Sequence, residues 1–163
     1  MPPRQIQSLL ALLNEAYAGP AWHGPCLHGS LRGVTHREAS WRPAPGRHSI
    51  WELTMHAAYW KYAVRRRLLG EKRGKFAEPG SNWFERQPGN DGKSAKAWRR
   101  DLALLARVHQ ELCAAVSELT EAALDRPSRG GRHTPRRMIA GTALHDAYHA
   151  GQIQLLKRLV RQR

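Results

Sequence analysis

The sequence is poor in cysteine and contains no long apolar run. Its 163 residues include two cysteines, Cys26 and Cys113, which are too few for a disulfide framework or a cysteine-based zinc site. Both are expected to be small buried apolar residues. No apolar run approaches the roughly 18 residues of a membrane-spanning helix, so no membrane partner is expected. The N-terminal segment is amphipathic rather than signal-like, and we expect a reducing, cytoplasmic location.

Acidic residues are also scarce. Their number is 13 against 27 lysines and arginines, which gives a formal net charge of +14. Such a charge makes anionic partners worth considering, nucleic acid among them. However, the chain shows no helix-turn-helix, zinc-finger or RNA-binding motif, and its cations are spread over the whole length. We therefore expect no specific nucleic-acid binding and interpret the charge as a property of the surface.

Strand-like alternation of useful length is absent, and helical periodicity takes its place. Long helices are expected over residues 4–18, 49–69, 94–124 and 134–160, with a shorter one over residues 25–33. Ser49 and Glu52 form a capping-box pattern, and Thr134 followed by Pro135 is a second start signal. The whole chain, 1–163, is therefore predicted to form a single all-α domain, a four-helix bundle with long interhelical connections.

Three of the nine histidines fall on apolar helix faces. His145 and His149 are four residues apart, so both lie on one face of the last helix. Chance alone gives about 0.4 such pairs in a chain of this composition, so the spacing by itself is weak evidence. Both residues, however, lie in the middle of the inward stripe, and His56 lies beside the apolar stripe of the second long helix. If the two helices are neighbours, His56 completes a set of three neutral imidazoles, which could hold a metal ion with open coordination positions, the pattern of a catalytic site.

The alternative is that these are three separate core histidines. A zinc-protease motif is excluded, because Asp146 stands where that motif has its glutamate base. We expect Asp146 to be a carboxylate that supports the metal ligands or lies on the surface. Of the other histidines, His48 and His23 are candidates to line the site, and His109 is expected in the core or at its boundary. The remaining ones, His28, His36 and His133, are expected to be exposed.

The residues around these positions resemble the DinB/YfiT-like superfamily. The resemblance covers nearly the whole chain and is carried by Ala-Trp-His-Gly-Pro at 21–25, by Trp-Arg-Pro at 41–43 and Pro-Gly-Arg-His-Ser-Ile-Trp-Glu-Leu at 45–53, and by His-Asp-Ala-Tyr-His-Ala-Gly-Gln-Ile at 145–153. It implies a four-helix bundle in which His56, His145 and His149 hold a divalent metal ion. Imidazole ligands suit zinc, nickel, iron or manganese, and the residues do not select among them.

The resemblance implies less about the reaction. Similar proteins include thiol-dependent S-transferases, a maleylpyruvate isomerase and metal-dependent hydrolases, and they often form homodimers. A low-molecular-weight thiol is therefore a candidate cofactor, and Arg47 is a candidate to hold its carboxylate. The main hypothesis is a metal-dependent enzyme, a transferase or hydrolase, that acts on a small-molecule substrate. The alternatives are a metal-binding or interaction module without catalysis and a nucleic-acid-associated basic protein.

Overall fold

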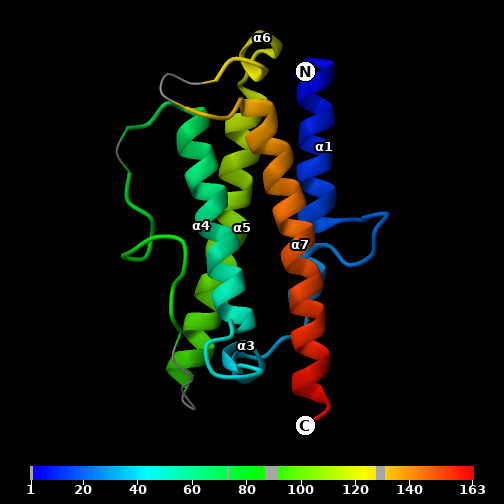
Figure 1. Ribbon diagram of the computed structural model, residues 1–163, viewed down its shortest axis with the longest axis vertical. Helices are drawn as coiled ribbons and strands as arrows, with labels where there is room; N and C mark the ends of the chain where they lie inside the picture. Colours follow the sequence, from blue (N-terminus) through cyan, green and yellow to red (C-terminus); the bar gives the residue numbers. More distant parts are fainter. Residues whose placement is uncertain (1, 73, 87–91, 128–130) are drawn as a thin grey trace.

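The computed structural model describes residues 2–72, 74–86, 92–127 and 131–163, and these contain α-helices but no strands (Figure 1). Four helices are long and three are short within this part of the chain. The long helices are α1 (Arg4–Ala18), α4 (Ile50–Leu68), α5 (Gly92–Ser117) and α7 (Pro135–Arg161). The short helices are α2 (Leu27–Leu31), α3 (His36–Ser40) and α6 (Glu121–Leu124). The predicted all-α fold is confirmed.

The ends of the helices follow the local signals in the sequence. The Ser49 hydroxyl accepts a hydrogen bond from the Glu52 amide at 3.2 Å, and the Glu52 carboxylate accepts one from the Ser49 amide at 2.9 Å. This reciprocal pair satisfies two backbone donors that would otherwise be orphaned at the start of α4. At the start of α7 the Thr134 hydroxyl accepts a single hydrogen bond, from the Arg137 amide. Gly19 ends α1 with φ of 77°, a conformation that a side chain would strain.

The four long helices run side by side as a bundle (Figure 1). Helix α4 packs between α5 and α7, and α1 packs against both α7 and α5. Two apolar clusters fill the interior. One is centred on α4 and α5 and includes Trp51 and Trp98, and the other joins α1, α5 and α7 around Ile6 and Leu112. The contact between α4 and α7 is the one that positions the candidate site.

Two expectations about the helices were wrong. The third long helix was expected to reach Leu124, but α5 ends at Ser117 and α6 is separate. Thr120 adopts an extended conformation before α6, and this break lets Leu124 turn back into the core. Helix α3 was not predicted, although Thr35 and Glu38 form a complete capping box there. A helix of one turn has too little periodicity to be seen without its cap.

No helix in the described ranges combines the length and the apolar character needed to cross a membrane.

Candidate metal centre

Helices α4 and α7 bring the three predicted histidines together. His56 extends from α4, and His145 and His149 extend from successive turns of α7. The Nε2 atom of His145 lies 3.1 Å from Nε2 of His56 and 3.0 Å from Nε2 of His149. Nitrogen atoms from all three rings lie within 4.8 Å of one another. The predicted site requires α4 to be a neighbour of α7, and the two helices are in contact.

The outer ring nitrogens of His56 and His149 determine which tautomer each ring adopts. His56 Nδ1 lies 2.8 Å from the backbone carbonyl oxygen of Asn82, and His149 Nδ1 lies 2.6 Å from the side-chain oxygen of Gln152. An oxygen of this kind can only accept, so each Nδ1 carries the proton and donates. The Nε2 atoms of both rings therefore present lone pairs toward His145. Metal-binding histidines commonly have their second nitrogen fixed in this way.

Burial keeps the three imidazoles neutral. It lowers the pKa of His145 to about 3, with the neighbouring His149, His56 and Lys61 acting in the same direction. Burial also lowers the pKa of His149 to about 4, against the opposing effect of its hydrogen bond to Gln152. The pKa of His56 is lowered as well, again mainly by burial. Neutral imidazole is the form that coordinates metal ions, so the site is ready to bind at neutral pH.

The donor set fits a divalent metal ion. Two lone pairs point at His145 Nε2, which can donate to only one of them even when it carries a proton. The other outer nitrogen, His145 Nδ1, is buried and has no hydrogen-bond partner among the described residues. Three nitrogen acceptors in contact, with too few protons between them, are electrostatically unfavourable. A cation shared by the three Nε2 atoms would remove this conflict, so we interpret the cluster as a candidate metal centre.

The segment that contains Asn82 and Trp83 covers the centre, and no part in the site was predicted for it. Asn82 has φ of 66°, which is uncommon for a residue other than glycine. Its side-chain oxygen accepts a hydrogen bond from the Trp60 indole at 2.9 Å, so both of its carbonyl groups are engaged by α4. The Trp83 indole stacks on His56 and on His48, with ring centroids 3.9 Å and 3.6 Å away. The signal in the sequence for such a contact is the pair Trp83 and Phe84, because two large aromatic side chains in a long connection are expected to pack against the protein.

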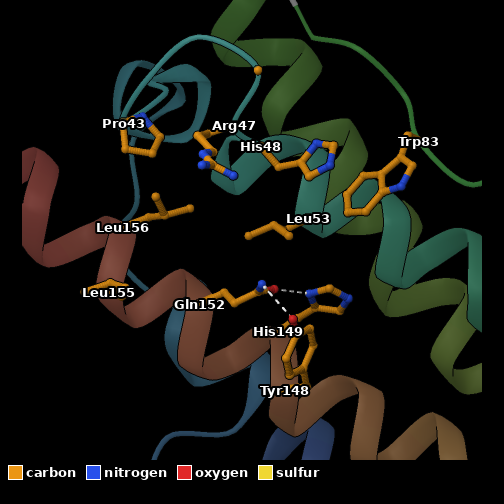
Figure 2. Close-up of a pocket in the computed structure, with 11 residues that line it drawn as sticks. Pro43, Arg47, His48, Leu53, Trp83, Tyr148, His149, Gln152, Leu155 and Leu156 are labelled. Carbon is orange, nitrogen blue, oxygen red and sulfur yellow. Dashed lines mark hydrogen bonds between the residues drawn. The ribbon is translucent and has the colours of Figure 1, made fainter.

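A cavity of about 440 Å³ opens beside His149 (Figure 2). The connector between α3 and α4 contributes Arg47 and His48 to one side of it, and α7 contributes Tyr148, His149 and Gln152 to the other. The complete lining consists of Pro43, Gly46, Arg47, His48, Leu53, Trp83, Tyr148, His149, Gln152, Leu155 and Leu156. We call this the Arg47 cavity. It combines an apolar floor with a few polar groups, which is the usual composition of a small-molecule site.

A second cavity, also of about 440 Å³, lies beside the other two histidines. His56, Trp60 and Val64 line it from α4, and Met138, Gly141, Thr142 and His145 line it from α7, with Asn82 completing it. We call this the Met138 cavity.

The other candidate residues divide between the site and the surface. Arg47 and His48 line the Arg47 cavity, whereas exposed His23 lines neither cavity. The connector that carries Arg47 is held by Arg42, which pairs with the buried Glu52 carboxylate at 2.5 and 2.7 Å and donates to the Arg47 carbonyl oxygen at 2.7 Å. Exposure of His28 and His133 is confirmed, but His36 is half-buried. Cys26 is buried as expected, and Cys113 is only half-buried.

Asp146 is neither a surface carboxylate nor a partner of the histidines. It is fully buried, and its Oδ2 atom is paired with the ammonium group of Lys61, which is also fully buried. The same ammonium group lies 3.3 Å from His109 Nδ1. The helical rotation between His145 and Asp146 turns the carboxylate toward the bundle interior, where α4 supplies a cation. The expectation for His109 is confirmed, because the residue is 4% exposed and its ring stacks on Tyr17.

The buried position of His109 predicts a loss of stability in acid. Burial, with help from Lys61, lowers the pKa of His109 to about 3. As the pH falls below about 6.5, the unfolded chain binds a proton at this residue and the folded chain does not, so stability decreases. We expect the His109→Gln variant to remove this contribution. Between pH 7 and pH 5, urea unfolding of the unmodified protein should lose about 2 kcal/mol more than unfolding of the variant. Equal losses would contradict this interpretation.

The comparison with protein families agrees with this geometry. The model of the DinB superfamily matches residues 26–153, which include all three histidines, the whole lining of the Met138 cavity and all of the Arg47 cavity lining except Leu155 and Leu156. The chain belongs to the DinB superfamily. This match begins at residue 26, so it does not include helix α1 or the Ala-Trp-His-Gly-Pro segment at 21–25. The resemblance stated from the sequence extends to these residues, and the family match does not test it there. Comparisons with curated proteins and with solved structures gave no match.

Proposed function

We propose that this DinB superfamily chain is a metal-dependent enzyme that acts on a small molecule, as a thiol-dependent transferase or as a hydrolase. The observation that carries the proposal is that the Nε2 atoms of His56 and His149 lie 3.1 and 3.0 Å from Nε2 of His145, between two cavities. A structural metal site is normally closed by four protein ligands, whereas three histidines leave coordination positions open. The cavities give a small molecule access to these positions, which distinguishes this proposal from a metal-binding module without catalysis.

The metal ion would lower the pKa of a thiol or of water and stabilise the resulting anion. The residues around it have separate tasks. Asn82 and Gln152 hold the His56 and His149 rings with their Nε2 lone pairs directed inward. Trp83 shields one face of His56 from solvent through its stacked indole. Arg47 and His48 provide the polar groups of the cavity that would orient the substrate.

The test compares metal-free protein with protein reconstituted with zinc, nickel, manganese or iron. Each form is assayed for thiol addition to electrophiles, with small thiols as donors, and for hydrolysis of simple esters and amides. We expect one bound ion per chain and activity only in a reconstituted form. Stoichiometric metal without activity in either assay would favour the non-catalytic alternative. Equal activity with and without metal would contradict the proposal.

The remaining expectations stay predictions. They are a homodimer, a cytoplasmic location, a low-molecular-weight thiol as cofactor and the lack of specific nucleic-acid binding. The cations that supported a nucleic-acid partner are partly engaged in ion pairs, such as Arg65 with Glu71 and Glu111, and Arg136 with Asp125. Duplex binding that weakens steeply with salt would support a nucleic-acid partner.

A further inference from the structure

The candidate metal centre separates two cavities of different chemistry. His149 lines the Arg47 cavity, and His56 and His145 line the Met138 cavity. The two lining sets have no residue in common among the described residues. Between them lies the Asn82–Trp83 segment, with Asn82 on the Met138 side and Trp83 on the Arg47 side. Both cavities have the same volume of about 440 Å³, so each could hold a small molecule of its own.

The Arg47 cavity is suited to an anion. Its lining has one permanent charge, the Arg47 guanidinium, and contains no acidic residue. No hydrogen bond or ion pair within the described residues involves that guanidinium, so its donors are available to a ligand. The nearby Glu52 carboxylate is already bound by Arg42 and Ser49 and does not compete for it. A free guanidinium beside apolar Leu53 and Leu156 favours a carboxylate with an apolar body.

The Met138 cavity is suited to an uncharged ligand. Apart from the neutral candidate metal ligands, the described residues that line it are apolar or uncharged, with Trp60, Val64 and Met138 as the large side chains. Asn82 uses its side-chain oxygen for the Trp60 indole, and the Thr142 hydroxyl donates to the Met138 carbonyl oxygen. The main polar groups are therefore satisfied within the protein. Gly141 leaves open space, since a Cβ atom there would meet nothing within 4 Å.

We propose that the two cavities bind two different ligands at once, a carboxylate-bearing small molecule in the Arg47 cavity and an uncharged apolar one in the Met138 cavity. This inference rests on the proposed function and deepens it, because it makes the enzyme one with two substrates that reach the same three histidines from opposite sides. It favours transfer between two organic molecules over simple hydrolysis. The high net charge of +14 would assist the capture of the anionic partner.

The test measures binding rather than turnover, so it separates the cavity proposal from the metal-dependent activity. Isothermal titration calorimetry with benzoate probes the Arg47 cavity, with neutral benzamide as the matched ligand. The fluorescence of N-phenyl-1-naphthylamine, an uncharged dye, probes the Met138 cavity. We expect Arg47→Gln to weaken benzoate binding about tenfold or more and to leave dye binding unchanged. Gly141→Leu, which fills the Met138 cavity, should weaken dye binding and leave benzoate binding unchanged.

Two control variants test whether these effects are local. Arg37→Gln removes an equal charge from an exposed arginine that lines neither cavity. Gly151→Leu makes the same change as Gly141→Leu at another open position of α7. Arg37→Gln should leave benzoate binding unchanged, and Gly151→Leu should leave dye binding unchanged. The proposal would be overturned if benzoate and the dye compete for binding, or if one variant loses binding of both probes. It would also be overturned if neither probe binds saturably at millimolar concentration. Failure to bind metal would instead contradict the proposed function.

Discussion

Replacing His145 with alanine is expected to lower the affinity for a divalent metal ion by about a hundredfold or more. His145 is the central member of the cluster, since its Nε2 atom contacts Nε2 of both His56 and His149. Without it, the two remaining lone pairs cannot form a three-coordinate site. The stabilisation that a saturating metal gives to the folded state should disappear as well, and this amounts to about 4 kcal/mol when the ion is at 1,000 times its dissociation constant.

The measurement is a titration with zinc or nickel, followed by metal analysis after dialysis and by the metal-dependent shift in melting temperature. His133→Ala, a change at an exposed histidine, is the control and should bind like the unmodified protein. Gln152→Leu should have a smaller effect, about tenfold to a hundredfold, because it removes only the acceptor that orients His149. Full metal content in the His145→Ala variant would show that the centre lies elsewhere.

Replacing Lys61 with methionine is expected to destabilise the protein by about 3–5 kcal/mol. Lys61 and Asp146 are both fully buried and form an ion pair between α4 and α7. The variant leaves the Asp146 carboxylate in the interior with neither oxygen paired, since Oδ1 has no partner among the described residues even now. Burial already raises the pKa of Asp146 against the opposing effect of Lys61. A large part of a typical total stability of about 5–15 kcal/mol would be lost.

The double variant Lys61→Met, Asp146→Leu tests the physical cause. Removing both charges together leaves no unpaired ion, so most of the lost stability should return. Urea unfolding at pH 7 measures both variants, and Lys75→Met, at an exposed lysine, serves as the control with an expected change below about 0.5 kcal/mol. If the single variant is as stable as the control, the buried pair is not an important contact of the bundle.

The positions of the helices were predictable where strong local signals mark their ends. The capping box of Ser49 and Glu52, the Thr134 cap and the stop at Gly19 are all read from adjacent residues and are all present. The same kind of signal at Thr35 and Glu38 marked α3, which was overlooked because five residues show no periodicity. The end of α5 was not predictable in this way, because the break before Thr120 depends on the burial of Leu124.

The candidate metal centre was predictable in its histidines but not in its surroundings. The spacing of His145 and His149 put both rings on one helix face, the apolar stripe of the second long helix indicated His56, and the family resemblance implied the same three residues. Nothing in the sequence indicated that the Asn82 carbonyl would accept the His56 proton, and the aromatic pair at 83–84 did not indicate which ring Trp83 would stack on. Both residues lie in a long irregular connection, where the backbone path depends on tertiary contacts rather than on local propensity.

The sequence by itself determined the all-α class, most helix boundaries and which histidines make up the candidate metal centre. These depend on interactions within a few residues along the chain, such as caps and helical periodicity. Only the tertiary structure decided that α4 lies against α7, that Lys61 faces Asp146, and that the triad opens into two cavities. The physical reason is that periodicity identifies the buried face of a helix but not the element it meets. The side chains of that neighbouring element determine which partner each buried polar group meets and where a cavity remains.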